Sequence, residues 1–413
     1  MDGVAVRHGS IESRTSWAVA ILVVALLTLT YGAQLIVVVA LKPIAESLDV
    51  PRAIPSLAAA LVWLGTGSGG IAMGVFADRV GVRWTVSIGT LMTGLGLLLS
   101  ASGSDWALLI GHGLFMGLLG GAGIVPPLIV YVSRWFDRRR GTALALVSSG
   151  NYIAGFLWPW LFQLSVGRIG WQQTMLAFAA LLTVLGVPAA FFCLRLQPPS
   201  PSAAAAAAAG PGAGTRVLGL RPNAAMAVLA LAPFFCCVPM AMPTAHLVAM
   251  CSDIGLSSGT GALMLSMLLG IAFFTQQFWG WVGDRLGGVG TVLLGSAAQA
   301  VSILVYAQFP SASGVVTGSV IYGLGFAGIV PAYVLAIRDL YPSREAGWRV
   351  PIMLLSGMSG MAVGSWLAGA IFDRTGHYAL AFQIGFLCNL INLAIVGLLV
   401  LRHGGLRVRP AFG

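Results

Sequence analysis

Charged residues are scarce in this chain. Asp, Glu, Lys and Arg make up only 8% of its 413 residues, and the mean hydropathy is +0.92. A soluble globular protein could not cover its surface with so few charges, so that class is excluded. Acidic residues are the scarcest, with 12 Asp and Glu against 22 Lys and Arg, and all the acids fall in expected loops, tails or helix boundaries. No carboxylate is therefore expected at mid-membrane depth.

Cysteine and catalytic motifs are also sparse. The five cysteines lie in or beside apolar runs without metal-ligand spacing, which favours core packing. The sequence contains no His/Glu metal motif, no phosphate-binding loop and no soluble region that would hold a cofactor. An enzyme is therefore excluded, and neither a metal nor a cofactor is expected. The N-terminal segment has no short apolar core with a small-residue cleavage site, so we expect a retained tail.

Long apolar runs are what the chain does contain. About twenty apolar residues span a bilayer core, and runs of this length predict helices at 17–41, 55–76, 84–102, 106–132, 142–166, 172–194, 224–250, 259–282, 289–308, 313–337, 350–371 and 379–401. The expected fold is an all-α membrane protein with 12 transmembrane helices. The expected organisation is a tail (1–16), a six-helix bundle (17–194), a Pro/Ala/Gly-rich linker (195–223), a second six-helix bundle (224–401) and a tail (402–413).

Three short patterns recur half a chain apart. The pattern GxxxDRxG occurs at Gly74–Gly81 and again at Gly280–Gly287, an offset of 206. Ala122–Pro126 recurs as Ala327–Pro331 at an offset of 205, and Arg168-Ile169-Gly170 is answered by Arg374-Thr375-Gly376 at 206. Each half is therefore expected to carry the same helix plan, as two pseudo-symmetric bundles.

The basic residues are distributed asymmetrically. With the N-terminus placed inside, 18 of the 22 fall on the cytoplasmic side, and only Lys42, Arg52, Arg168 and Arg374 fall outside. Such a bias follows the positive-inside rule. The net charge of +10 is therefore attributed to topology, with both termini cytoplasmic and the lipid bilayer as the surrounding medium, and no nucleic-acid partner is expected.

Six plus six helices with the repeated motif resemble the major facilitator superfamily. Within it, Lys42–Glu46 (KPIAE), Arg134–Gly141 (RWFDRRRG) and Phe372–Gly376 (FDRTG) resemble the monocarboxylate transporter and oxalate-formate exchanger branch and its bacterial relatives. The resemblance implies a secondary transporter in a bacterial plasma membrane, working as a monomer by alternating access. Its implied cargo is a small organic solute, foremost a monocarboxylate or related organic anion, with proton symport as one mode.

The repeated motif is expected to form a cytoplasmic gate. Asp78 at a helix end would pair with basic residues, and Gly74 and Gly81 would allow close approach of the helices. A tight turn that only anchors the membrane boundary is the alternative. The expected gate residues are Gly74, Asp78, Arg79, Gly81, Arg83, Gly280, Asp284 and Arg285.

The resemblance also points to coupling residues. Lys42, the only lysine, aligns with a lysine that human monocarboxylate transporters use in proton and substrate handling. Those transporters carry an arginine and, one turn earlier, an aspartate on helix 8, but Gln276 and Ala272 stand here. Amides bind a carboxylate more weakly than a charged fork does. His112 and His246 are the other candidates for proton exchange, although a packing role is the alternative for each.

A set of polar side chains on apolar helices is expected to line a solute cavity. The expected substrate-binding residues are Tyr31, Gln34, Asn151, Tyr152, His246, Gln276, Gln277 and Tyr322. Each side chain has interhelical packing as its alternative role. Two other functions stay open: an exporter or facilitator of a neutral or amphipathic molecule, and a membrane sensor that binds a solute without moving it.

Overall fold

The computed structural model describes residues 12–136, 139–196 and 217–402. Most of the predicted tails (1–16 and 402–413) and of the predicted linker (195–223) lies outside these residues, at 1–11, 403–413 and 197–216. The described residues are helical almost throughout, and their only β-pairing is an isolated bridge between Val217 and Leu220 just before the second half.

The first half comprises α1 (Arg14–Val39), α2 (Leu41–Leu48), α3 (Ala53–Val80), α4 (Val82–Ser100), α5 (Asp105–Ile110), the π-helix η1 (Gly111–Gly121), α6 (Ala122–Ser133), α7 (Arg140–Ser148), α8 (Gly150–Leu181), the π-helix η2 (Leu182–Gly186) and α9 (Val187–Cys193). The second half comprises α11 (Pro222–Asp253), α12 (Ser258–Gln308), α13 (Ala312–Gly325), α14 (Ile329–Leu340), α15 (Ser343–Thr375) and α16 (Ala379–Arg402).

Ten helical stretches among the described residues are long and apolar enough to cross a membrane. Two of these, Thr142–Cys193 and Ser258–Gln308, have 52 and 51 residues, more than twice the length that a bilayer core needs. Each turns back at a glycine with positive φ, Gly170 (+80°) or Gly287 (+69°). Counting each of the two long stretches twice gives twelve membrane-spanning segments and confirms the predicted fold class.

The duplication is visible in the backbone as well as in the sequence. Left-handed residues occur in pairs 206 positions apart: Gly81 (φ +97°) with Gly287 (φ +69°), Gly170 (φ +80°) with Gly376 (φ +73°), and Asp49 (φ +52°) with Gly255 (φ +84°). Side chains other than glycine rarely adopt this conformation except at turns. The same turns therefore end the same helices in both halves.

Several helices begin or end at different residues from the apolar runs that predict them. Residues 41–48 form α2, which the apolar runs do not predict, and α15 begins at Ser343, seven residues before the expected start. Helix α3 continues to Val80, so Asp78 lies in its last turn and not in a loop. Hydropathy marks only the residues that enter the apolar core, whereas backbone hydrogen bonding continues into the polar boundary.

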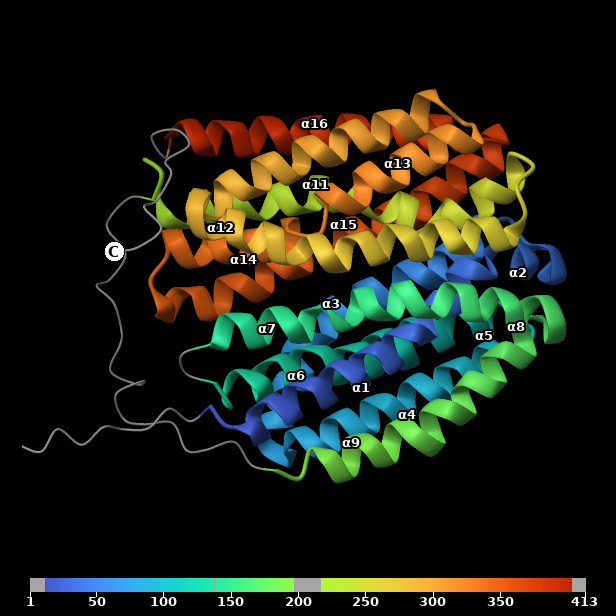
Figure 1. Ribbon diagram of the computed structural model, residues 1–413, viewed down its shortest axis with the longest axis horizontal. Coiled ribbons are helices and arrows are strands. Elements are labelled where there is room, and N and C mark those ends of the chain that lie inside the picture. Colours follow the sequence, from blue (N-terminus) through green and yellow to red (C-terminus); the bar gives the residue numbers. More distant parts are fainter. Residues whose placement is uncertain (1–11, 137–138, 197–216, 403–413) are drawn as a thin grey trace, which may run out of the picture.

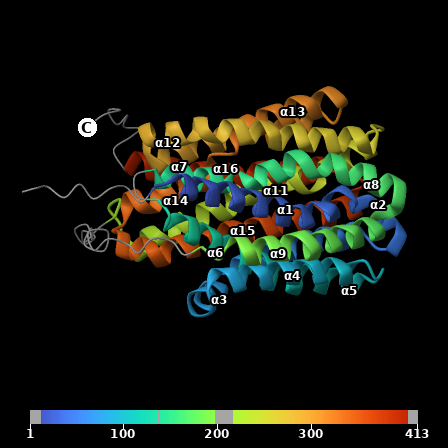
Figure 2. The same cartoon turned by 60° about the horizontal axis from the view of Figure 1, so that its bottom comes forward.

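The two halves lie side by side, with the first half below the second in the view of Figure 1. They meet mainly along two helix pairs, α3 with α15 and α8 with α12, and α1 and α2 also contact α11. The turned view in Figure 2 shows α3, α4 and α5 along one edge and α12 and α13 along the other. Helix α1 begins and α16 ends at the same end of the molecule, named the inner end after the predicted orientation, and α2 lies at the opposite, outer end (Figure 1).

A buried polar network joins three helices of the second half. The Tyr333 hydroxyl donates to Asn392 Oδ1 (2.6 Å), Asn392 Nδ2 donates to Ser296 Oγ (2.9 Å), and Asn389 Nδ2 donates to the Ser296 carbonyl (2.9 Å). All four residues are buried. At an offset of 206, the first half has Gly186 in place of Asn392, so the same network cannot form there.

Replacing Asn392 with leucine is expected to destabilise the fold. The change leaves the buried Tyr333 and Ser296 hydroxyls without that partner, at a cost of about 1–3 kcal/mol for each. The midpoint of thermal unfolding in detergent should therefore fall by several degrees. Gln277→Leu is the matched control, because it removes an exposed amide from α12. An unchanged midpoint in Asn392→Leu would contradict a structural role for the network.

Candidate functional site

A cavity of about 90 Å³ is lined by residues of the first half and by Met358 of α15 from the second half. That volume holds about three water-sized groups, because each occupies about 30 Å³ in the liquid. Its lining has no Asp, Glu, Lys, Arg or His. The polar members of the lining are Thr30, Tyr31, Gln34, Thr66, Thr93 and Asn151.

Most of these hydroxyls already have a partner in the protein. Thr30 and Thr93 each donate to a carbonyl one turn back on their own helix, at 2.9 Å. Thr66 donates to the carbonyl of Gly117 at 3.4 Å. Asn151 differs, because its Oδ1 is buried and has no hydrogen-bond partner among the described residues. An unpaired buried oxygen is costly, so Asn151, which lines the cavity, carries a vacant acceptor.

The equivalent region of the second half is filled. The positions 206 residues after Thr30, Gln34 and Thr93 are Cys236, Met240 and Gln299. Gln299 Nε2 donates to the Cys236 carbonyl (2.9 Å), and the hydroxyl of the fully buried Tyr322 donates to the Met240 carbonyl (2.6 Å). The duplicated halves are thus unequal: the first contains a cavity where the second contains packed side chains.

Two equivalent side chains, Met358 and Tyr152, each reach from one half to the other. Met358 of α15 lines the cavity of the first half. Its equivalent at an offset of 206 is Tyr152 of α8, whose hydroxyl donates to the Ala327 carbonyl of the second half (3.3 Å) and whose ring meets Phe326 edge-on at 5.8 Å. Movement of the halves must therefore break both contacts, and the Met358 contact lies at the cavity.

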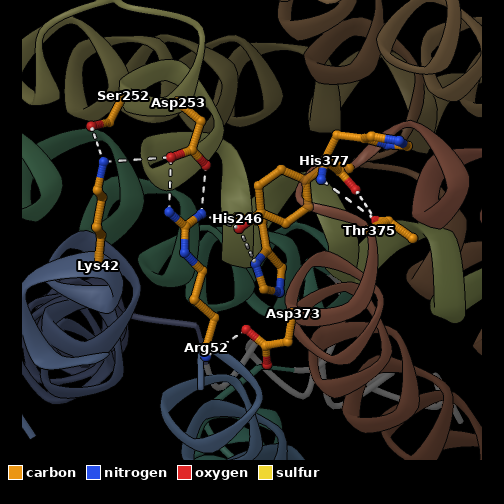
Figure 3. A network of polar contacts seen from close by, with 9 residues as sticks. Lys42, Arg52, His246, Ser252, Asp253, Asp373, Thr375 and His377 are labelled. Carbon is orange, nitrogen blue, oxygen red and sulfur yellow. Dashed lines mark hydrogen bonds and ion pairs between the residues drawn. The ribbon is translucent and has the colours of Figure 1, made fainter. Parts of the chain in front are cut away.

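The outer end is closed by charged contacts between the halves (Figure 3). Arg52 of the first half donates to both carboxylate oxygens of Asp253 in the second, at 2.5 and 2.8 Å. Lys42 lies 3.5 Å from the same carboxylate and also donates to Ser252 at 3.4 Å. These contacts, together with Asp373 and Tyr378, form the outer clamp: Lys42, Arg52, Asp253, Asp373 and Tyr378.

Asp373 binds the start of α3 from the other half. Its two carboxylate oxygens accept the backbone N–H groups of Arg52 and Ala53, each at 2.8 Å. The first N–H groups of a helix have no partner within the helix and carry a partial positive charge, so a carboxylate is favourable there. The Arg52 guanidinium also lies over the Phe372 ring, 3.8 Å from its centroid.

The pKa values of two clamp residues, Arg52 and Tyr378, differ from their ordinary values. Burial by itself lowers the pKa of Arg52, but the hydrogen bonds to Asp253 and Tyr378 raise it above the ordinary value. Burial also raises the pKa of Tyr378, although the nearby Arg52 opposes the change. Arg52 is therefore permanently charged and Tyr378 permanently neutral at physiological pH.

His246 connects to the clamp and not to the cavity. It is fully buried in α11, with Nδ1 3.2 Å from the Tyr378 hydroxyl and Nε2 2.7 Å from the Ser365 carbonyl. It does not belong to the cavity lining, so the expectation that it binds substrate directly has no support in the geometry. Lys42 likewise lies at the outer clamp and outside that lining.

The predicted inner gate residues do not join the halves in this conformation. Asp78 pairs with Arg134 of its own half at 3.4 Å, and both side chains are largely exposed. A Cβ atom added at Gly74, Gly81 or Gly280 would meet nothing within 4 Å, so close helix approach does not explain these glycines. Gly81 is required instead by its positive φ. Among the described residues, every ion pair between the halves lies at the outer end.

The remaining motif residues pack locally. Arg83 lies over the Trp84 and Phe191 rings, and Arg285 lies over Trp281 at 4.0 Å. Arg79 and Asp284 are exposed. The structure thus shows a carrier-like arrangement whose outer end is closed, and the inner motif residues keep their gating role as a prediction for another conformation.

Other predicted site residues are dispersed. Of the eight proposed for substrate binding, the cavity lining includes Tyr31, Gln34 and Asn151. Gln276 is buried, and its Oε1 has no partner in the described part of the chain, whereas Gln277 is exposed. His112 is buried in η1, where its Nδ1 lies 3.0 Å from both Ser100 Oγ and the Leu108 carbonyl. That arrangement fits the packing alternative for His112.

Sequence reasoning misses the partners in the outer clamp. It places Arg52 only among four outer basic residues, and Asp253 and Asp373 only among acids at helix boundaries. The signal that is available is scarcity: few charges are expected on the outer side, so acids and bases placed there have few alternatives to pairing with one another. Which of them pair depends on how the two halves meet.

The geometry agrees with what is known of related sequences. The sequence profile described as the Major Facilitator Superfamily matches residues 20–347. The chain belongs to this superfamily. Its relatives include the MFS transporter asaE of Aspergillus flavus, 24% identical over 74% of this chain and 67% of that protein. Monocarboxylate transporter 13 of Bos taurus is 25% identical over 75% of this chain and 71% of that protein. An uncharacterized MFS-type transporter, YcxA of Bacillus subtilis, is 22% identical over 83% of this chain and 85% of that protein.

Solved structures support the same superfamily fold. One is a bacterial homologue of the human lysosomal transporter Spinster in an inward-facing and occupied conformation. It has a TM-score of 0.67 at 16% identity, and the match covers 97% of this chain and 100% of that chain. The peptide transporter POT in complex with sulfate has a TM-score of 0.72 at 15% identity, and the match covers 93% of this chain and 94% of that chain. The protein is thus a multi-pass membrane transporter of this superfamily, and the monocarboxylate branch remains one interpretation among relatives of several kinds.

Proposed function

We propose that this protein is an alternating-access carrier for a small organic solute without net charge, bound in the cavity of the first half. The observation that carries the proposal is the charge-free lining of that cavity. A carboxylate moved from water into such a site costs several kcal/mol unless a cation compensates it. A neutral solute that forms hydrogen bonds suits the uncharged polar side chains of Asn151, Tyr31 and Gln34 in this lining.

The alternating-access part rests on the two helix pairs between the halves. The outer clamp holds α3 against α15, and its bonds all run from one half to the other. Opening the outer end requires these bonds to break, after which the cavity would face the outer side. The predicted motif at the inner end, with Asp78 and Asp284, would then hold the opposite end closed.

A monocarboxylate is the second candidate, because both outer cations belong to the first half. Lys42 and Arg52 would lose Asp253 when the halves separate at the outer end, leaving two positive charges at the mouth. Such charges attract anions. The similarity to a protein named monocarboxylate transporter 13 supports the same candidate.

Flux into proteoliposomes separates the two candidates. A panel of small monocarboxylic acids should be compared with the primary amides of the same acids, which match them in size but carry no charge, each with and without a proton gradient. We expect uptake of amides, and only weak uptake of the matching carboxylates. Preferred carboxylate uptake would reverse this order, and Lys42→Gln should then raise the carboxylate KM at least about tenfold. Binding without flux would indicate a sensor.

A further inference from the structure

The hydrogen bonds around His246 have only one consistent direction. A guanidinium only donates, so the Tyr378 hydroxyl accepts from Arg52 Nη1 at 3.2 Å and keeps its own hydrogen for His246 Nδ1. A carbonyl only accepts, so His246 Nε2 donates to Ser365 at 2.7 Å. With the outer end closed, the chain of bonds thus assigns His246 as a neutral ring with its hydrogen on Nε2.

A second proton on His246 would oppose this closed arrangement. Protonated Nδ1 would become a donor facing the Tyr378 hydroxyl, whose hydrogen would have to turn away. The new positive charge would also lie one hydroxyl group from Arg52. His246 is fully buried, so water would not relieve either conflict.

The carboxylates near His246 are already engaged. Asp373, at the outer end of α15, uses both oxygens on the backbone N–H groups of Arg52 and Ala53. Asp253, two turns further along α11, uses both oxygens on Arg52 and one of them also on Lys42. Figure 3 shows Lys42 and Arg52 reaching Asp253, with His246 to one side of Arg52. In the closed clamp both carboxylates therefore bind donors of the first half, and His246 bonds to Tyr378 and Ser365 instead.

Separation of the halves makes a second proton on His246 favourable. Arg52 and Lys42 leave with the first half, whereas His246, Tyr378, Asp253 and Asp373 all stay with the second. The Tyr378 hydroxyl is then free to accept from a protonated ring, and two carboxylates lose their cations. A proton on His246 and an open outer end therefore favour each other, as linkage requires.

We propose that His246 is a proton-binding switch of the outer clamp: Nδ1 takes a proton from outer water when the halves separate, and returns it before Arg52 can close the clamp. The proposal rests on the proposed alternating-access function but not on the identity of the solute. The closed state is favoured at high outer pH, and the open state gains as the outer pH falls through the range in which histidine titrates.

Distances between spin labels at the outer ends of the two halves test the switch directly. Labels on cysteines at the exposed positions Ser104 and Ser258, with the native cysteines replaced, report the separation without any solute. Between about pH 8 and about pH 5, the ratio of open to closed molecules should rise at least about tenfold. In His246→Gln, whose amide can make both neutral hydrogen bonds, the ratio should no longer respond to pH.

Two matched variants and one alternative variant complete the test. His112→Gln alters the other buried histidine, and His377→Gln alters an exposed histidine beside Tyr378; both should keep the pH response. If His246→Gln fails to fold, Tyr378→Phe removes the hydroxyl between Arg52 and His246 and should blunt the response. A response that persists in His246→Gln or in Tyr378→Phe, or is absent from the unmodified protein, overturns the proposal. Failure of solute flux with an intact response would instead contradict the proposed function.

Discussion

Asp253→Asn is expected to open the outer end of the carrier. The Asp253 carboxylate offsets two cations of the opposite half and accepts two short hydrogen bonds from Arg52. The pair lies at the surface but is partly shielded, with 12% of the Arg52 side chain and 20% of the Asp253 side chain exposed. Charge-assisted bonds of this kind contribute about 1.5–3 kcal/mol. Their loss should raise the ratio of open to closed molecules about ten- to hundredfold.

A cysteine placed at Ser56 gives the measurement for this prediction. Ser56 is fully buried below Arg52, where it packs against α15 at Gly369. Its reaction with a membrane-impermeant thiol reagent, in a background without other cysteines, should accelerate in proportion to the open population. Glu46→Gln, which neutralises an exposed acid of α2 outside the clamp, should leave the rate unchanged. Equal rates with and without the Asp253→Asn change would argue against the clamp as the outer gate.

Asn151→Leu is expected to reduce transport strongly while leaving the fold intact. The Asn151 Oδ1 has no partner among the described residues, so its removal leaves no protein group unpaired. A solute bound there would lose a hydrogen bond and bury an unpaired group, which costs about 1–3 kcal/mol, or about five- to hundredfold in the ratio of rate to KM. The midpoint of thermal unfolding should stay the same or rise.

The contrast with Asn392→Leu makes this prediction specific. Both variants replace an asparagine in a membrane-spanning helix with leucine, but Asn392 is fully bonded to Ser296 and Tyr333 whereas the Asn151 oxygen is not. Asn392→Leu should therefore lower stability, and Asn151→Leu should lower transport. A drop in the unfolding midpoint of Asn151→Leu with normal transport would reassign Asn151 to packing.

Much of the architecture followed from local pattern. The apolar runs and the repeated GxxxDRxG and Arg-x-Gly signals predicted twelve helices in two related halves, because a bilayer core requires runs of fixed length and the turns at Gly81, Gly170, Gly287 and Gly376 require glycine for a left-handed backbone. Helix ends were less well predicted, since Asp78 and Ser343 lie in polar helical turns that hydropathy does not detect.

The candidate site was only partly accessible to the same reasoning. Polar residues on apolar helices could be recognised, and Tyr31, Gln34 and Asn151 do meet at one cavity. Sequence could not distinguish them from Tyr322, which has the same character but fills space in the second half. The difference depends on whether neighbouring helices bring a partner to the polar atom, and that partner is usually remote in the chain.

The sequence alone therefore determined the membrane-embedded class, the helix plan and its duplication, because each is dictated by composition and by spacing along one helix. The tertiary structure decided which half holds the cavity, and that Arg52, Asp253, Asp373 and Tyr378 form one clamp. Residues 52 and 253 are 201 positions apart, and only the packing of two separately formed bundles brings them within hydrogen-bonding distance. Charges this far apart in sequence pair according to the geometry of the interface, which no local pattern encodes.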